Sequence, residues 1–378
     1  MMRAELQPKT LRDFLDLCYN SPMGFLSKKI INFQEKYFGI DLSDLSVKIV
    51  QLENNGSMDS VRAYSFLPIP AGCIGDGKIV DKQKIAEIIG LAIKKAAPKK
   101  INTKKAICSL PESKVFLRVL SIPKMEKAEI GEAIKWEIEA SIPLSVDQVY
   151  YDWQIVGEVE NKQRILTVAI SRETVDDILE VLKMAKLESY GLETESIAAA
   201  KSLIPENSSG DETSLIIDLG AKRTNFIVVE GNVPFFTSSV SFSSIGVTES
   251  IAKAFGVSSE EAEKMKITQG IICSREKSFA LESIKAYLES LSAEIEKSID
   301  FYQSISGETS NVKKIILCGN GANLKGLVPY LAKRLKRRVF IGDAWVNFNF
   351  GNNLPIINKE KSLQFSIAIG LAMQKKRI

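Results

Sequence analysis

Short apolar runs and stretches of helical spacing alternate along this chain, which predicts an α/β protein. Apolar runs bounded by turn residues predict strands. They occur at 37–53 (a hairpin), 61–67, 106–110, 115–122, 149–156, 164–170, 214–236 (a second hairpin that continues into a further strand), 314–318 and 338–341. Apolar residues three to four positions apart predict helices at 85–96, 126–141, 174–186, 247–255, 260–266, 281–302, 324–336 and 366–373.

Residues 112–190 form a block with its own order of elements, strand–helix–strand–strand–helix. In the helix at 126–141, acidic residues crowd the first turns, where the helix dipole favours them. Ile130, Ile134 and Ile138 make its apolar stripe. The block therefore predicts a separate small α/β subdomain with its own core.

The chain's 378 residues are too many for one ordinary core, so two or more domains are expected. No stretch reaches the roughly 18 apolar residues of a membrane span, and no signal-peptide pattern opens the chain. Five cysteines without CxxC spacing argue against zinc and structural disulfides, and for reduced thiols in the cytoplasm. The absence of histidine excludes Ser-His-Asp chemistry and imidazole catalysis.

Two segments of the chain are rich in basic residues. The net charge of +4 is too mild to indicate a nucleic-acid partner, and six lysines between 94 and 105 lack interleaved aromatic residues, so we interpret them as a solvated helix end and loop. Residues 25–33 mix apolar and basic side chains at near-helical spacing. This segment fits either an amphipathic contact with an anionic membrane, through residues 23–34, or a terminal helix packed on the body.

A repeated strand–turn–strand unit is the most informative feature. Asp41 and Asp218 each stand at the end of an apolar run, and Glu53 and Glu230 follow at the same distance. A triphosphate with Mg²⁺ needs inward-pointing backbone N–H groups, small residues and nearby carboxylates, and both turns supply them. The candidate residues are Asp41, Ser43, Asp44, Leu45, Ser46 and Lys48 in the first turn, and Asp218, Gly220, Ala221, Lys222 and Thr224 in the second.

A third element is the glycine-rich turn that follows the predicted strand at 314–318. Gly319 and Gly321 lack side chains that would keep a flat base or ribose from the backbone, and Asn323 is placed to cap the next helix. The turn is neither GxGxxG nor a Walker A sequence, so it indicates neither a Rossmann nor a P-loop site.

In this order, the three elements resemble the two phosphate hairpins and the adenosine turn of the actin-like ATPase superfamily. Six further motifs, at 109–116, 122–125, 134–139, 152–154, 294–302 and 368–372, are similar to those of the PilM family. PilM proteins are cytoplasmic actin-like components of type IV pilus assembly machines and relatives of the division protein FtsA. The resemblance covers about residues 37–375.

The resemblance implies a ribonuclease H-like α/β fold with two lobes around a nucleotide cleft and an inserted FtsA/PilM-type subdomain. ATP or ADP would bind there with Mg²⁺, which Asp41 and Asp218 would approach through water. The residues that would line the adenosine or contact its sugar or base are Gly319, Asn320, Gly321, Asn323, Glu294 and Lys297.

The resemblance also implies a domain plan and a partner. An N-terminal extension (1–36) would precede the first lobe (37–111) and the inserted subdomain (112–190). Residues 191–378 would supply the remainder of the first lobe and the second lobe. In PilM-like proteins, a groove beside the inserted subdomain binds the short cytoplasmic tail of the membrane protein PilN. We therefore expect the chain at the inner face of the cytoplasmic membrane, with other pilus platform or motor proteins as further partners.

Departures from the family pattern bear on nucleotide binding. Ser243 and Ser244 stand where relatives usually carry paired glycines, and serine adds bulk and restricts positive φ. Asn320 stands where a glycine is common, and the N-terminal extension is longer than usual.

Three functions fit the sequence. The first is a nucleotide-binding scaffold in pilus assembly, competence or secretion; the second is an active ATPase or sugar kinase on the same fold. Slow or absent hydrolysis is favoured, because no catalytic base is evident beyond the two aspartates. The third is an FtsA-like division protein. Such a protein needs a C-terminal amphipathic membrane helix, and residues 372–378 are too short to form one. The sequence does not decide whether the chain forms a homo-oligomer.

Overall fold

The computed structural model describes residues 35–54, 58–159, 161–208, 212–271, 278–306 and 311–373. The predicted segment at 25–33, with its two interpretations, lies outside these residues. The described chain divides into two compact units, one formed by residues up to 53 and 62–195, the other by 54–61 and 196–373. Among the described residues no helix is long and apolar enough to cross a membrane.

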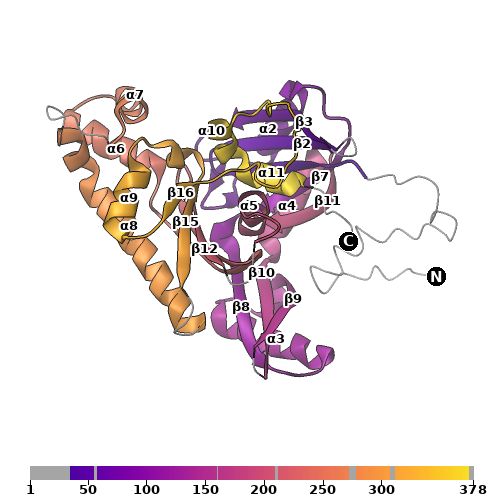
Figure 1. Ribbon diagram of the computed structural model, residues 1–378. Coiled ribbons are helices and arrows are strands. Elements are labelled where there is room, and N and C mark those ends of the chain that lie inside the picture. Colours follow the sequence, from indigo (N-terminus) through magenta and orange to yellow (C-terminus); the bar gives the residue numbers. More distant parts are fainter. Residues whose placement is uncertain are drawn as a thin grey trace. The chain divides into compact units, whose positions relative to one another are not determined.

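A six-stranded sheet carries the first hairpin in the first unit (Figure 1). Its strands are β1 (Phe38–Ser43), β2 (Ser46–Asn54), β3 (Asp59–Pro68), β6 (Ala97–Pro98), β7 (Lys105–Leu110) and β11 (Glu188–Thr194), in the order β11-β7-β1-β2-β3-β6. β1 pairs antiparallel with β2 and parallel with β7, which pairs parallel with β11. Because β1 lies inside the sheet and both faces are covered, five of its six residues are buried.

Two helices, α2 (Lys82–Lys95) and α4 (Arg172–Met184), pack into the core of this sheet. Ile85 and Ile89 of α2 and Val175 and Val181 of α4 share one apolar cluster with Ile40 of β1. The sequence assigned α4 to the inserted subdomain. Its apolar face instead completes the core of the six-stranded sheet. A short hairpin, β4 (Ile74–Gly75) and β5 (Lys78–Ile79), precedes α2.

The inserted subdomain consists of β8 (Val115–Pro123), α3 (Lys127–Ser141), β9 (Val149–Val159) and β10 (Lys162–Ser171). β10 pairs antiparallel with both β8 and β9. Ile130, Ile134 and Ile138 of α3 are buried in a second apolar cluster, which also contains Ile165 of β10. The predicted apolar stripe is therefore confirmed, and the capping box between Glu126 and Glu129 fixes the start of the helix.

The second unit holds the second hairpin, in strands β12 (Thr213–Leu219), β13 (Thr224–Glu230), β14 (Val233–Val240), β15 (Val312–Cys318) and β16 (Val339–Ile341). β12 pairs antiparallel with β13 and parallel with β15, and β15 pairs parallel with β16. β13 also pairs antiparallel with β14. The pairing sets Asp218 of β12 beside Cys318 of β15, so the second hairpin and the glycine-rich turn meet at one end of the sheet.

Helices complete the second unit (Figure 1). They are α5 (Glu195–Leu203), α6 (Ser244–Phe255), α7 (Ser259–Gln269), α8 (Ser278–Ser306), α9 (Leu327–Leu335), α10 (Lys359–Ser362) and α11 (Ser366–Ala372). α6 packs against α7 and α8, and α8 packs against α9. Every residue of α11 is buried, and its Gly370 lies against Ala198 of α5.

Several elements differ from the sequence prediction: the short elements β4, β5, β6 and α10 were not predicted, and two longer regions also differ. The helix expected at 324–336 begins only at Leu327, because residues 320–323 form a 3-10 turn and Gly326 precedes the helix with a φ of 87°. The segment from Glu188 to Leu203, for which no element was predicted, forms β11 and α5. Gly191 interrupts the apolar pattern of β11, so its pairing with β7 decides its conformation.

Candidate functional site

The first hairpin buries Asp41 and leaves one of its oxygens available. Asp41 is fully buried, and its Oδ2 accepts from Lys48 Nζ at 2.7 Å. Its Oδ1 has no hydrogen-bond partner among the described residues. A buried carboxylate oxygen without a partner fits a ligand such as a hydrated cation. No group of three or more His, Cys, Asp or Glu residues in the described part of the chain is placed to hold a metal ion.

The other predicted residues of the first turn contact one another or nearby loops. Ser43 Oγ lies 2.9 Å from Ser46 Oγ and donates to the Ser46 carbonyl. Asp44 Oδ1 accepts from Gly77 N at 3.0 Å, and the Leu45 carbonyl accepts from the amide of Ile69. These bonds give the turn a fixed shape.

A buried carboxylate that the sequence did not single out lies near Asp41. Glu195 directly follows β11, is 9% exposed, and its Oε2 accepts from the amide of Glu112. Burial, together with the charges of Asp41 and Glu195, raises the pKa of the Cys108 thiol to about 12. Cys108 of β7 pairs with Ile40, the residue before Asp41, and Leu110 of β7 pairs with Thr194, the residue before Glu195. Asp41 and Glu195 therefore gather near the carboxyl ends of the parallel strands β1, β7 and β11.

The second turn is tied to the start of α6. Gly220 N donates to the Arg223 carbonyl at 3.0 Å, and a Cβ at Gly220 would meet that oxygen at 2.7 Å. The carbonyls of Gly220 and Ala221 accept from the amides of Ser244 and Ile245. Thr224 Oγ1 donates to the Phe242 carbonyl, and Lys222 is half-exposed beside these bonds. The turn thus uses two of the free N–H groups at the start of α6.

The glycines of the third element are required by contacts within the protein. A Cβ at Gly319, whose φ is 76°, would lie 2.4 Å from Asp218 Oδ1. A Cβ at Gly321 would lie 2.8 Å from Leu219 Cβ. The sequence explained these glycines by the approach of a base. The structure shows that they let the turn approach the end of β12.

A pocket of about 200 Å³ opens beside this turn. Three predicted residues line it, namely Asn320, Gly321 and Asn323. Its apolar wall consists of Leu219, Phe242, Val247, Ile267, Leu288, Leu324 and Leu327, and its other polar residues are Ser244, Glu263 and Lys266. An apolar wall with a few convergent polar groups suits a flat heterocycle with a polar sugar.

Lys266 is the main feature of this pocket that the sequence analysis missed. Its side chain is nearly buried, and Nζ donates to the Ser244 carbonyl at 3.0 Å, Ser244 Oγ at 2.9 Å and Thr248 Oγ1 at 2.8 Å. Glu263 Oε2 lies 2.6 Å from the same nitrogen. This network joins α6 to α7 and gives the pocket a charged wall.

Ser243 and Ser244 have separate roles. Ser243 Oγ accepts from Gly246 N at 3.1 Å and caps α6, as the sequence allowed. Ser244 Oγ binds Lys266, as described above. A Cβ at Gly246 would meet the Tyr287 hydroxyl at 1.8 Å, so the start of α6 is closely packed.

Two predicted assignments do not match these contacts. Glu294 and Lys297 do not line the pocket; they lie 3.6 Å apart on α8, and the Lys297 side chain is 77% exposed. Asn323 does not cap α9, because Gly326 occupies the cap position, and the Asn323 amide approaches the Glu360 carbonyl at 3.5 Å.

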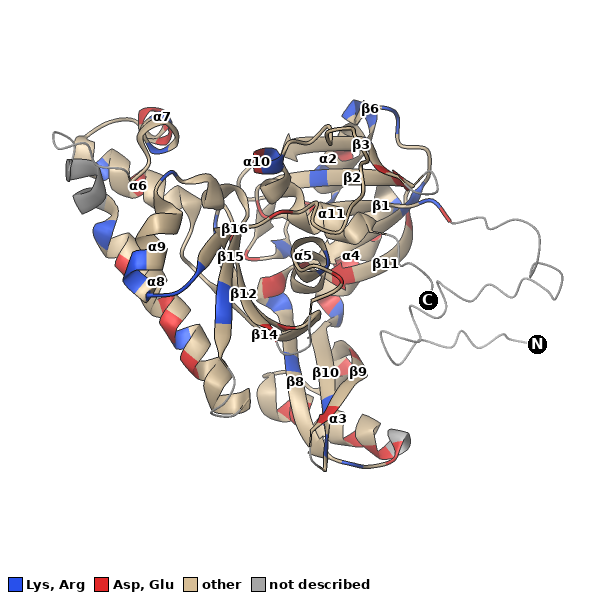
Figure 2. Ribbon diagram, in the orientation of Figure 1, with Lys and Arg blue, Asp and Glu red and all other residues tan. Residues whose placement is uncertain are grey.

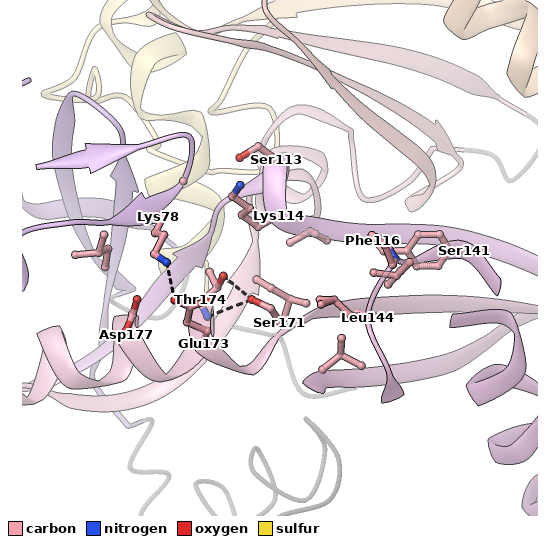
Figure 3. Close-up of a pocket in the computed structure, with 18 residues that line it drawn as sticks. Lys78, Ser113, Lys114, Phe116, Ser141, Leu144, Ser171, Glu173, Thr174 and Asp177 are labelled. Carbon is pink, nitrogen blue, oxygen red and sulfur yellow. Dashed lines mark hydrogen bonds and ion pairs between the residues drawn. The ribbon is translucent and has the colours of Figure 1, made fainter. Parts of the chain in front are cut away.

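A groove of about 520 Å³ lies in the first unit, between the inserted subdomain and the β4–β5 hairpin (Figure 3). Its apolar lining is Ile79, Val115, Phe116, Ile142, Pro143, Leu144, Val149, Ala169 and Ile170. Lys78, Lys114, Glu173 and Asp177 supply charge, and Lys78 Nζ pairs with Glu173 Oε1 at 2.6 Å (Figure 3). Apolar side chains beside charged ones suit a short peptide with apolar anchors.

The reactivity of Cys108 and Cys318 tests the burial of the strands that pair with the two hairpins. Burial and the charge of Asp218 raise the pKa of Cys318, and the pKa of Cys108 is also raised. A raised pKa keeps a thiol protonated at pH 8, and only the thiolate reacts quickly. We expect iodoacetamide at pH 8 to label the half-buried Cys73 and to spare Cys108 and Cys318, as measured by peptide mass mapping. In urea all three should react; labelling of native Cys108 as fast as Cys73 would contradict its burial.

Solved structures similar to this chain share an actin-like architecture. A PilM-PilN type IV pilus biogenesis complex matches with 23% identity and a TM-score of 0.74, covering 90% of this chain and 98% of that one. The ethanolamine utilization protein EutJ from Carboxydothermus hydrogenoformans matches with 15% identity and a TM-score of 0.52, covering 89% and 88%. MreB 5 of Spiroplasma citri bound to AMPPNP matches with 13% identity and a TM-score of 0.52, covering 89% and 95%.

At these identities the similarity shows the fold alone, and it confirms the actin-like α/β fold that the resemblance implied. The family is shown by sequence. The profile of the family described as type IV pilus assembly protein PilM matches residues 39–376 of the 378. Because this match covers nearly the whole chain, the protein belongs to the PilM family of type IV pilus assembly proteins.

Proposed function

We propose that this protein is a cytoplasmic scaffold of a type IV pilus assembly machine, or of a related competence or secretion machine, and that it binds the cytoplasmic tail of a PilN-like membrane protein. The groove in the first unit is the observation that carries this proposal. One similar structure is a PilM-PilN complex, and a partner of that kind would bring the chain to the inner face of the membrane.

The lining of the groove indicates how such a tail binds. Phe116 and Leu144 offer apolar surface to anchor side chains (Figure 3). Lys114, which pairs with Asp76 at 3.2 Å, and Asp177, which pairs with Lys82 at 2.6 Å, place one charge of each sign in the wall of the groove. Ser171 caps α4 through the amide of Thr174, which fixes the start of the helix that forms one wall.

Replacing Leu144 with Asp tests the groove. Leu144 lies in the loop after α3 and is half-buried, so the variant should fold. A charge in an apolar anchor site should weaken binding of the labelled tail of this organism's PilN-like protein at least about tenfold. Fluorescence anisotropy measures the Kd. Val159→Asp, at an exposed position of β9 outside the groove, is the matched control. Equal affinity in Leu144→Asp and wild type would reject the groove as the binding site.

We infer further that ATP or ADP binds with Mg²⁺, and that its adenosine occupies the pocket of the second unit. The apolar wall, the Lys266 network and the close Gly319–Gly321 turn support this inference. The resemblance implies Asp218 and Asp41 for the metal, and the Oδ1 of Asp41, which has no hydrogen-bond partner among the described residues, supports this role for Asp41. Mg²⁺ would offset the charge of the phosphates there.

In this proposal nucleotide sets the conformation of the scaffold, and hydrolysis is slow or absent. A ligand shifts a conformational equilibrium only by its difference in affinity for the two states. Saturable binding of a fluorescent ATP analogue to wild type is the first test of the nucleotide proposal. Steady-state phosphate release at about 1 s⁻¹ or faster would contradict slow hydrolysis and indicate an active ATPase. Glu195 would then be the first residue to substitute in a search for the catalytic acid or base.

A further inference from the structure

The segment that joins α9 to β16 is strongly basic. Residues 327–342 contain five cations and no Asp or Glu, in a chain whose net charge is only +4. The cations are Lys333, Arg334, Lys336, Arg337 and Arg338. Figure 2 shows this connection in blue beside α8 and β16.

Two of the five cations have structural partners. Arg334 pairs with Glu289 at 2.8 Å and Glu296 at 3.1 Å, both on α8. Arg337 Nη1 donates to Asn311 Oδ1 and to the Val312 carbonyl, and so holds the start of β15.

The remaining cations are exposed and have no carboxylate partner among the described residues. Lys333, Lys336 and Arg338 are exposed, and Lys313 of β15 is exposed next to the site where Arg337 binds. The pairing of Ile315 with Val339 keeps Lys313 and Arg338 on neighbouring strand ends.

Exposed apolar side chains accompany these cations. Phe340 and Ile341 of β16 are 41% and 39% exposed, and the Arg338 guanidinium lies 5.2 Å from the Phe340 ring centroid. β16 pairs with β15 alone within the described sheet of this unit, so it is an edge strand. Charges on an edge strand can merely prevent aggregation, but that role does not explain two adjacent exposed apolar side chains. We call Lys313, Lys333, Lys336, Arg338, Phe340 and Ile341 the basic edge.

We propose that the basic edge binds the surface of an anionic phospholipid bilayer. Lysine and arginine near such a surface are attracted by its negative potential, and exposed aromatic or aliphatic side chains insert at the level of the headgroups. The basic edge lines neither the groove nor the pocket described above, which favours a flat surface over a peptide. This contact does not depend on nucleotide or on a PilN-like tail.

Flotation of the full-length protein with vesicles tests the proposal. We expect binding to vesicles of 70% phosphatidylcholine and 30% phosphatidylglycerol, and little binding to phosphatidylcholine alone. Lys336→Glu combined with Arg338→Glu should reduce the partition coefficient at least about tenfold, since each basic residue contributes to membrane attraction. Phe340→Ser should reduce it less, without changing its salt dependence. The matched control is Lys94→Glu with Lys95→Glu, two exposed lysines at the end of α2 with the same change in net charge.

The predicted amphipathic segment at 25–33 offers a competing site. Lys28→Glu with Lys29→Glu in the full chain distinguishes the two sites. Loss of binding in this variant, together with full binding in Lys336→Glu/Arg338→Glu, would overturn the proposal. Equal loss in the Lys94→Glu/Lys95→Glu control would also overturn it, because binding would then follow net charge alone. Absence of wild-type binding to the anionic vesicles is a third contrary result.

Discussion

Asp218→Asn is expected to weaken binding of Mg–ATP by about 10- to 100-fold, since a hydrogen bond to a charged group is worth about 1.5–3 kcal/mol. Asp218 is 9% exposed at the end of β12, and the Gly319 turn approaches its carboxylate. Asparagine keeps the shape of the side chain and removes the negative charge that would attract a hydrated Mg²⁺. Titration of a fluorescent ATP analogue, with Mg²⁺ and then with EDTA, measures the effect.

Magnesium dependence separates this role from a merely structural one. Wild type should lose affinity in EDTA, whereas Asp218→Asn should respond little, because the charge that depends on the metal is already absent. Asp300→Asn, at an exposed position of α8, is the control and should bind as wild type. If Asp218→Asn unfolds at the same temperature as wild type, has the same Kd for the ATP analogue and responds to EDTA in the same way, then Asp218 is not part of the metal site.

Local patterns in the sequence predicted the parts of the fold that depend on short-range order. The two hairpins could be predicted because each holds short apolar runs on both sides of a turn of small polar residues. Likewise Ile130, Ile134 and Ile138 mark one helix face by spacing alone, and they are buried in the structure. Recognising the family required the order of several such motifs, each weak by itself.

Contacts between distant elements could not be predicted in this way. Lys266 and Ser244 lie on different helices, so their contact cannot be predicted from short-range patterns. The many charged residues of α7 are typical of a helix face exposed to solvent, so the sequence does not indicate that the Lys266 ammonium lies in the pocket. Glu294 and Lys297 were chosen from a motif, yet the described residue of α8 that lines the pocket is Leu288, six positions before Glu294. Pocket walls depend on which helix faces pack together, and one sequence does not specify that.

The glycines illustrate a related limit. The sequence marked Gly319 and Gly321 as sites of close approach, and the structure confirms close approach. The approaching atoms belong to Asp218 and Leu219 of the protein's own chain. A glycine pattern indicates that something must come near the backbone, but it does not say whether a ligand or another strand does so.

Gly370→Ala is expected to lower the free energy of unfolding by about 3 kcal/mol, at the upper end of the usual range for overpacking. A Cβ at Gly370 would lie 1.9 Å from the Ala198 carbonyl oxygen and 2.6 Å from its carbon. These are backbone atoms of α5, so no rotation of a side chain relieves the clash. Since every residue of α11 is buried, the helix must move as a whole. Urea unfolding followed by circular dichroism measures the loss.

Gly90→Ala is the matched control for this substitution. Gly90 lies within α2, and a Cβ there meets no atom within 4 Å. Alanine in a helix interior is more favourable than glycine by about 0.5–1 kcal/mol, so this variant should be more stable than wild type. Opposite signs for the same chemical change would show that packing of α11 on α5, rather than helix propensity, requires glycine at 370. A Gly370→Ala protein as stable as wild type would contradict the close contact between α11 and α5.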